Sequence, residues 1–382
     1  CLTKEQRLSL QMDEFMNRRY EFRYNTQIGE VEYRERFSFR FYFHPIDKRA
    51  QNSIMLDAQS EGIGVWDRDI DRYLHSNRVP IYNPLEEFLF HLPHWDGKDR
   101  IHALANRVPC NNPHWELLFH RWFLNMVSHW RGVNKMYANS TSPILVGAQG
   151  THKSTFCREM IPPALRAYYT DSIDFSQKRD AELYLNRFAL INIDEFDQIT
   201  LTQQGFLKHI LQKPVVNLRK PHGRSVLELQ RYASFIGTSN QKDLLTDPSG
   251  SRRFICIEVT GNIDTTQPID YEQLYAQAMY EIHHGERYWF DSEDEQIMTE
   301  NNREFEQTPA MLQLFYQYFK TAQTKEEGEF LTPVEILNYL KKKSGMSLSD
   351  NKVYHFGRLL QKCGIPSKHT YKGTVYQVIK LS

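Results

Sequence analysis

The sequence has few cysteines, no long apolar run and no net charge. Its five cysteines stand far apart and none belongs to a CxxC pair, so the sequence predicts neither a zinc site nor a disulfide framework. No stretch approaches the roughly 18 consecutive apolar residues of a membrane span, and no signal peptide is visible. We therefore expect a cytoplasmic protein without membrane contact.

The charge balance excludes a global electrostatic attraction to nucleic acid. Lys plus Arg and Asp plus Glu both number 47, so any nucleic-acid site must be a local basic patch. The length of 382 residues indicates two or three domains. The chain begins at Cys1 rather than Met, as expected of a fragment of a longer protein.

One stretch combines strand, loop and helix signals in the order of a phosphate-binding loop. Backbone N–H groups of such a loop and the helix N-terminus behind it hold phosphate, Lys153 would reach the β- and γ-phosphates of ATP, and Ser154 would bind Mg²⁺. The template is Gly, four residues, Gly, Lys, and Ser or Thr, and here His152 stands in place of the second glycine. The predicted nucleotide-binding residues are Gly147, Gln149, Gly150, Thr151, His152, Lys153, Ser154 and Thr155.

A second apolar run, residues 188–193, ends in the acidic pair Asp194 and Glu195. As a parallel strand next to the phosphate-loop strand, it would bring both carboxylates to the same edge of the sheet. Asp194 would then help to hold Mg²⁺, and Glu195 would act as the general base that polarises the attacking water. The alternative is an ordinary helix cap. The 41-residue offset from Lys153 to Asp194 leaves room for a helix, a strand and their connections, which favours the catalytic interpretation.

Residues 214–229 form two alternating runs around a basic turn, which predicts a β-hairpin. The tip residues Lys220, His222 and Arg224 are suited to contact a phosphate backbone, because such contacts need no base sequence. The alternative is a solvated hairpin without a ligand.

Polar residues also flank the next two predicted strands. Residues 233–239 end at Asn240, whose amide would orient water near a γ-phosphate. Arg252 and Arg253 precede the strand at residues 254–259. Either they form salt bridges within the fold, or one of them reaches the nucleotide of a neighbouring subunit as an arginine finger.

The N-terminal part is predicted to be mostly helical. Residues 3–20 form an amphipathic helix with a capping box, residues 20–43 a short hairpin, and residues 47–132 a series of helices broken at prolines. The hairpin is rich in arginines. They could contact nucleic acid, but a face exposed to solvent or packed on another domain is the favoured interpretation. Three histidines lack partners at metal-ligand spacing, which favours core or surface positions: His114, His120 and His129.

The C-terminal part follows the acidic stretch at residues 291–306. A helix that opens with Pro333, a second helix over residues 350–363 and a hairpin turning on Lys372 and Gly373 give the order of a winged helix. Lysines concentrate here, so this part binds duplex DNA or serves as a protein contact.

The motifs GAQGTHKST, LINIDEFD, LRKPHGR, FIGTSN and DPSGSRRF occur in the order typical of one family. The sequence resembles the virulence-associated E family of P-loop proteins, in particular the Bacteroidetes type, and more distantly superfamily-three helicases and phage primase-helicases. The resemblance spans about residues 60–260. It implies an α/β P-loop ATPase core of the AAA+ type at residues 139–290, between a mostly helical N-terminal domain at 1–138 and a winged-helix-like domain at 291–382.

The resemblance also implies roles for individual residues. Lys153, Asp194, Glu195 and Asn240 would be catalytic, with Arg252 or Arg253 as the finger acting in trans within a homo-oligomer, for which a hexameric ring is one form. The tip of the basic hairpin would face a central pore. His152 departs from the family pattern and puts the rate of hydrolysis in question more than nucleotide binding.

Three functions are compatible with these sequence features. The first is an ATP-hydrolysing, helicase-like motor on nucleic acid, with DNA expected rather than RNA, from a mobile element or its host. The second is a nucleotide-gated switch or adaptor with slow hydrolysis and a protein partner, which His152 favours. The third is a small-molecule kinase, which leaves the basic hairpin unexplained and lacks a lid of arginines.

Overall fold

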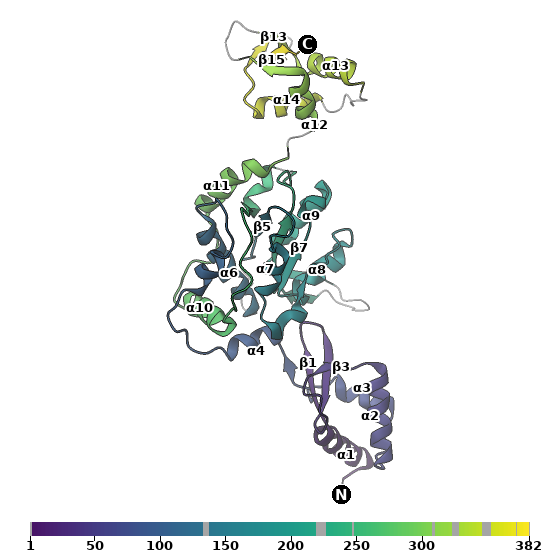
Figure 1. Ribbon diagram of the computed structural model, residues 1–382. Coiled ribbons are helices and arrows are strands. Elements are labelled where there is room, and N and C mark those ends of the chain that lie inside the picture. The colour runs from purple at the N-terminus through teal and green to yellow at the C-terminus, as the bar shows by residue number, and fades with distance from the viewer. Residues whose placement is uncertain are drawn as a thin grey trace. The chain divides into compact units, whose positions relative to one another are not determined.

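The structure is a computed structural model that describes residues 2–132, 137–218, 227–246, 248–307, 310–322, 328–345, 353–371 and 373–381. The chain forms two compact units, Cys1–Phe305 and Glu306–Ser382 (Figure 1). No helix within these described ranges is long and apolar enough to cross a membrane.

The first unit opens with a small α/β part that has its own apolar core. Its elements are α1 (Lys4–Arg19), β1 (Tyr20–Asn25), β2 (Glu30–Glu35), β3 (His44–Pro45), α2 (Lys48–Ser60), α3 (Asp67–Leu74) and β4 (Ile81–Tyr82). The capping box is present as predicted, since Thr3 Oγ1 accepts from Gln6 N at 3.2 Å and Gln6 Oε1 accepts from Thr3 N at 2.9 Å. The hairpin predicted over residues 20–43 is β1–β2, whose second strand ends at Glu35, and residues 36–43 form a loop instead of a strand. This hairpin is the centre of a larger sheet of order β3-β2-β1-β4.

The arginines of this hairpin and of the adjoining end of α1 are largely engaged within the same part of the chain. They pair with neighbouring carboxylates: Arg18 and Arg19 with Glu61, Arg23 with Glu32, and Arg34 and Arg36 with Glu21. All five guanidinium groups are thus engaged in ion pairs with three carboxylates, so the arginine face is not an open basic surface.

A series of helices follows, as predicted from the prolines. It comprises α4 (Pro84–Phe90), α5 (Arg100–Ala105) and α6 (Trp115–Trp130). Pro84 occupies the first turn of α4, where its missing N–H costs nothing, and the Asn83 side chain caps that turn by accepting from Leu85 N at 3.1 Å. Helix α6 is buried on almost every side and packs on the central sheet, which explains its nearly unbroken apolar sequence.

The central sheet has five parallel strands, in the order β11-β5-β10-β7-β6. Their bounds are β5 (Ser142–Val146), β6 (Tyr169–Thr170), β7 (Leu190–Ile193), β10 (Ser234–Ser239) and β11 (Phe254–Glu258). One prediction is wrong here. The strand that delivers Asp194, β7, is not next to β5, the strand that leads into the predicted phosphate loop, because β10 pairs with both and lies between them. The sequence could not show this, since strand order depends on how distant segments pair.

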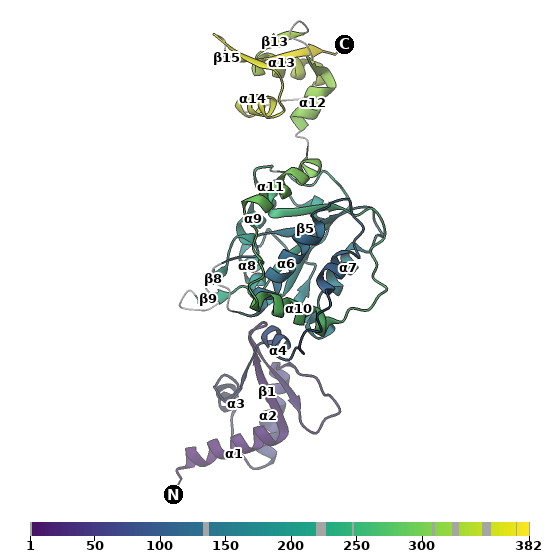
Figure 2. The same cartoon turned by 90° about the vertical axis from the view of Figure 1, so that its left-hand side faces the viewer.

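Helices cover both faces of this sheet (Figures 1 and 2). The remaining helical elements of the first unit are α7 (Lys153–Glu159), η1 (Pro163–Tyr168), α8 (Lys178–Arg187), η2 (Phe196–Gln198), α9 (Leu201–Leu211), η3 (Pro248–Arg253), α10 (Tyr271–His283), α11 (Ser292–Asn301) and η4 (Asn302–Phe305). Successive strand residues face opposite layers: Leu145 packs with α6 and α10, whereas Ile144 and Val146 pack with α9. Burial on both faces accounts for the unbroken apolar runs of the strands.

Two segments beyond the sheet bear on the predictions. Strands β8 (Val215–Leu218) and β9 (Leu227–Gln230) pair antiparallel, which confirms the hairpin, while its tip with Lys220, His222 and Arg224 lies outside the described residues. Helix α11 and η4 belong to the first unit, because Asn302 Nδ2 donates to the carbonyls of Ser251 and Phe254, both at 2.7 Å.

The second unit combines helices with a small antiparallel sheet of order β12-β15-β13, in which β14 also pairs with β15. Its elements are α12 (Ala310–Tyr318), β12 (Phe319–Thr321), β13 (Glu329–Leu331), α13 (Pro333–Ser344), α14 (Val353–Lys362), β14 (Ser367–Thr370) and β15 (Gly373–Lys380). Thr332 caps α13, Pro333 begins it and Gly345 ends it in the left-handed conformation. Two helices followed by a hairpin occur here in the predicted order.

Candidate nucleotide-binding site

The predicted phosphate loop connects the end of β5 to the start of α7. Gly147 begins the loop, and its N–H donates to Ser239 O at 3.1 Å. A Cβ at this position would lie 2.9 Å from the carbonyl oxygen of Val259, so a larger residue would force the backbone to shift. Gly150 has a φ of +84°, which a residue with a side chain rarely adopts. Both glycines are therefore explained by local geometry.

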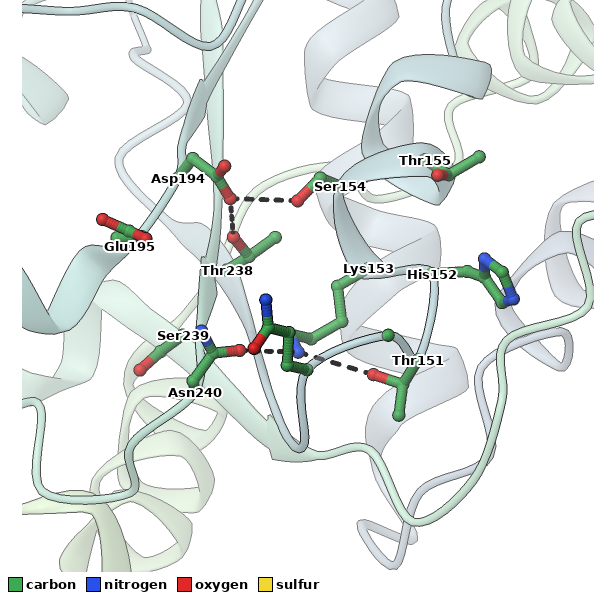
Figure 3. Close-up of a pocket in the computed structure, with 12 residues that line it drawn as sticks. Thr151, His152, Lys153, Ser154, Thr155, Asp194, Glu195, Thr238, Ser239 and Asn240 are labelled. Atoms are coloured by element: carbon green, nitrogen blue, oxygen red, sulfur yellow. Dashed lines mark hydrogen bonds between the residues drawn. The ribbon is translucent and has the colours of Figure 1, made fainter.

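The loop borders a cavity of about 330 Å³ at the carboxyl edge of the sheet (Figure 3). Ten of the residues that line it were singled out from the sequence: Gln149, Gly150, Thr151, His152, Lys153, Ser154, Thr155, Asp194, Glu195 and Asn240. Thr238 and Ser239, at the end of β10, complete the lining. Segments from three strands therefore meet at one edge, as expected for parallel strands.

Lys153 lies at the centre of this cavity and is only 7% exposed. Its Nζ donates to the carbonyl oxygens of Gly147 and Ala148, both at 2.8 Å, and to Asn240 Oδ1 at 3.2 Å. Burial lowers the pKa of the Lys153 ammonium below its ordinary value, against an opposing effect of the nearby Asp194 carboxylate. The contact with Asn240 joins the loop to the end of β10.

Asp194 faces Ser154 across the cavity. Its Oδ1 accepts from Ser154 Oγ at 2.9 Å and also from Thr238 Oγ1 (Figure 3). A carboxylate and two hydroxyl groups are hard oxygen donors of the kind that Mg²⁺ prefers, so these residues fit such an ion. Thr238 was not among the residues predicted from the sequence, although its position in the polar end of the FIGTSN strand, close to Asn240, could have indicated a place in the site.

A second pair of contacts supports the far side of the cavity. Ser239 Oγ is 2.7 Å from Asp197 Oδ1 and accepts from Gln241 N at 3.0 Å. Asp197 lies in η2, directly after Glu195 and Phe196. The segment that follows the acidic pair is therefore bonded to the end of β10.

Two residues of the site have left-handed backbones without being glycine. Glu195 has a φ of 52° and His152 a φ of 65°. Such conformations cost free energy and occur preferentially at functional sites. At position 152 this conformation explains why the template has glycine. The His152 side chain is exposed, and its ring lies on the opposite side of the loop from Asp194 (Figure 3).

Arg252 and Arg253 are not part of this cavity. They directly precede β11, whose first residue Phe254 pairs with Ser142, whereas the predicted phosphate loop begins after Val146 at the other end of β5. Five residues of strand separate the two ends by about 16 Å. Arg252 pairs with Glu295 at 2.9 Å and is about half exposed.

The remaining sequence candidates do not form a metal site. Within the described parts of the chain, no three His, Cys, Asp or Glu side chains are grouped so that they could hold a metal ion. His120 Nε2 lies 2.6 Å from Glu281 Oε2, and His129 is fully buried and accepts from Asn139 N at 2.9 Å. The cysteines among the described residues are free thiols.

Comparison with known proteins gives matches to families and to solved structures. The apo structure of the NrS-1 C-terminal region covers 100% of this chain and 100% of its own, at 11% identity and a TM-score of 0.51. An A-form apo structure of the same region covers 97% of this chain and 99% of its own, at 11% identity and a TM-score of 0.46. At such identity the first match supports the fold alone. No curated protein matches the chain.

Two family models divide the chain near the boundary between its two units. Residues 308–378 match a family described as a domain of unknown function from a B. theta gene. Residues 89–307 match the virulence-associated protein E-like domain, which confirms the resemblance seen in the five ordered motifs. This match covers more than half of the chain, and the chain therefore belongs to the virulence-associated protein E-like family.

Proposed function

We propose that this protein is an ATP-hydrolysing P-loop ATPase of the AAA+ type, which acts on nucleic acid as a helicase-like motor in the replication of a phage or mobile element. The observation that carries this proposal is the cavity in which Lys153 and Ser154 face Asp194, Glu195 and Asn240. Family membership and the five-stranded parallel sheet support it.

In this proposal each residue of the cavity has a role. The loop from Gly147 to Thr155 holds the phosphates of ATP, and Lys153 moves its three N–H donors from loop carbonyls to phosphate oxygens. Ser154 and Asp194 hold Mg²⁺, which would offset the charge of the phosphates. Glu195 accepts the proton of the attacking water, and Asn240 orients that water.

The other predicted parts extend this proposal. Because Arg252 and Arg253 lie at the opposite end of β11 from the cavity, neither reaches its own nucleotide, and a finger role requires a neighbouring copy in a homo-oligomer such as a hexameric ring. The hairpin residues Lys220, His222 and Arg224 would contact nucleic acid, DNA rather than RNA. The winged-helix-like domain, the three-part division of the chain and a cytoplasmic location remain predictions.

The test is an ATPase titration with single- and double-stranded DNA. We expect hydrolysis that DNA stimulates and that Lys153→Ala abolishes, because an alanine offers no donor to the phosphates. Lys48→Ala, an exposed lysine of α2, is the matched control and should hydrolyse ATP as the wild type does. Absence of hydrolysis in the wild type, with and without DNA, would refute the proposal.

A mixing experiment tests the ring. Arg252→Ala and Arg253→Ala are each combined with Lys153→Ala subunits, which keep both arginines. If one arginine acts in trans, mixing restores part of the activity that neither variant has alone. Mass measurements with and without ATP should show assembly under the same conditions.

The switch or adaptor remains the alternative. It rested on His152, whose exposed side chain points away from the carboxylates and gives no steric reason for slow hydrolysis. A single turnover without stimulation by nucleic acid would nevertheless favour the switch over the motor.

A further inference from the structure

A short loop between β2 and β3 exposes an unusual number of aromatic rings. Its sequence, residues 36–43, is RFSFRFYF. Phe37 is 87% exposed, Phe39 96%, Phe41 77% and Tyr42 64%. Four exposed aromatic side chains within residues 37–42 are a concentration of apolar surface of the kind that marks interaction sites. The loop lies outside the residues that either family model matches.

The start of this aromatic loop is tied to the end of α1. Arg36 Nε donates to Asn17 O at 2.7 Å and lies 3.2 Å from Tyr20 O. Its Nη1 also donates to Glu21 at 3.3 Å. These contacts fix the first residue of the loop on the neighbouring helix and strand.

The end of the loop is held by stacked cations. Arg34 Nη1 donates to Phe41 O at 2.9 Å. The Phe43 ring has the guanidinium groups of Arg23 and Arg34 at 4.1 and 4.7 Å from its centre, and Arg23 also lies 3.7 Å from the centre of the Tyr82 ring. Because both ends are anchored, the backbone that carries the exposed rings is held in place, so little backbone freedom is lost when a ligand binds.

A hollow of about 180 Å³ lies beside the rings. Its lining residues are Glu21, Arg34, Glu35, Arg36, Ser38, Arg40 and Phe41. Glu21 already pairs with both Arg34 and Arg36. Three guanidinium groups therefore face two carboxylates, and Arg40 has no ion pair with any described residue, which leaves a small positive excess next to Phe41.

We propose that this aromatic loop binds single-stranded nucleic acid, with bases stacked on Phe37, Phe39 and Phe41 and a backbone phosphate near Arg40. This inference rests on the proposed function and deepens it by naming a second contact, apart from the basic hairpin. Aromatic rings interleaved with arginines suit unpaired bases, whose faces are exposed, whereas paired bases in a duplex are covered. Each stacked base contributes about 1–3 kcal/mol without regard to sequence.

The salt dependence of binding distinguishes the aromatic loop from the basic hairpin at residues 214–229. Since only Arg40 is available to a phosphate, the loop accounts for about one released counterion. Most of its contribution is stacking, which salt hardly changes. Loss of the rings should therefore weaken binding while the slope of affinity against salt stays almost constant.

The test measures the binding of the full chain to a fluorescent oligothymidine of about 20 nucleotides, by polarisation at several salt concentrations. Phe39→Ala should weaken binding about 5- to 150-fold, the equivalent of one stacked base. Phe39→Tyr should bind the oligonucleotide as the wild type does, because it keeps an aromatic ring, whereas Phe39→Leu should bind as weakly as Phe39→Ala. Phe90→Ala is the matched control, because Phe90 is 83% exposed but lies at the end of α4, outside the loop.

The remaining outcomes overturn the inference in distinguishable ways. Wild-type affinity in Phe39→Ala, combined with a smaller assembled mass, would assign the loop to a contact with a second copy. Wild-type affinity combined with lost binding to phosphatidylcholine vesicles would assign it to a lipid surface. If DNA stimulates hydrolysis in the wild type but loop variants bind normally, only the loop inference fails. If the wild type neither binds the oligonucleotide nor responds to it, the proposed function fails as well.

Discussion

Arg231 provides the sharpest test of how the first unit is held together. It follows β9 directly and is fully buried. Its guanidinium group donates only to backbone carbonyl oxygens: Ala233 at 2.9 Å, Ile210 at 3.1 Å, Leu211 at 2.8 Å, Lys213 at 2.8 Å and Asn139 at 3.1 Å. These carbonyls belong to the end of α9 and to the segments that lead into β5, β8 and β10. Burial lowers the pKa of Arg231 to about 9, which leaves it charged at neutral pH.

The expected effect of Arg231→Lys follows from counting donors. Arginine has five N–H donors in a planar fork, and lysine has three at a single point. At least two of the five bonds are therefore lost, and a buried hydrogen bond to a charged group contributes about 1.5–3 kcal/mol. We expect the free energy of unfolding to fall by about 3–6 kcal/mol, a large share of the roughly 5–15 kcal/mol typical of a domain. Arg231→Met, which loses all five bonds, should cost more.

Urea unfolding followed by tryptophan fluorescence reports this loss. All six tryptophans lie in the first unit, at positions 66, 95, 115, 122, 130 and 289, so the signal does not include the second unit. Arg68→Gln is the control, because its side chain is 77% exposed and its removal should change stability by less than about 0.5 kcal/mol. A loss below about 1 kcal/mol in Arg231→Lys would refute the reasoning that these carbonyls depend on the guanidinium group.

Three further predictions concern the same unit. Burial lowers the pKa of His129 from 6.5 to about 3, so as the pH falls below 6.5 the unfolded state takes up a proton that the folded state does not. The free energy of unfolding should therefore fall by about 1.4 kcal/mol between pH 8 and 5.5. Urea titrations of the wild type and of His129→Gln at both pH values isolate the contribution of this histidine. Gly147→Ala should weaken nucleotide binding at least about tenfold by calorimetry, because its Cβ would meet Val259 O, whereas Gly205→Ala, where that space is open, should not. Thr238→Val removes the donor to Asp194 and should slow hydrolysis about tenfold at unchanged nucleotide affinity, with recovery in Thr238→Ser; equal rates in all three proteins would contradict a role for this hydroxyl.

Features set by neighbouring residues were predictable from the sequence. The capping box of α1, the turn of the β1–β2 hairpin and the start of α13 at Pro333 all depend on contacts within a few residues. The passage from strand to loop to helix around Gly150 belongs to the same class, because glycine, lysine and serine at fixed spacing limit the local backbone. These elements occur where the sequence placed them.

Features set by distant residues were not predictable in this way. The sequence left open whether the arginines near the N-terminal hairpin contact nucleic acid, solvent or another domain, and the fold pairs four of them with Glu21 and Glu61. The exposed rings of the aromatic loop looked like ordinary strand residues. Alternation predicts a buried face, and only the fold showed that no described element covers Phe37 and Phe39.

The sequence by itself determined that a glycine-containing loop between a strand and a helix, an acidic pair and a polar strand end exist in this protein, because each is a local arrangement of residue types. The tertiary structure alone decided how they meet. It inserted β10 between β5 and β7, which brought Thr238 onto Asp194 and Asn240 onto Lys153. It also turned His152 outward and put Arg252 at the far end of the sheet. Pairing between strands that are tens of residues apart depends on the packing of the whole unit, which no local pattern encodes.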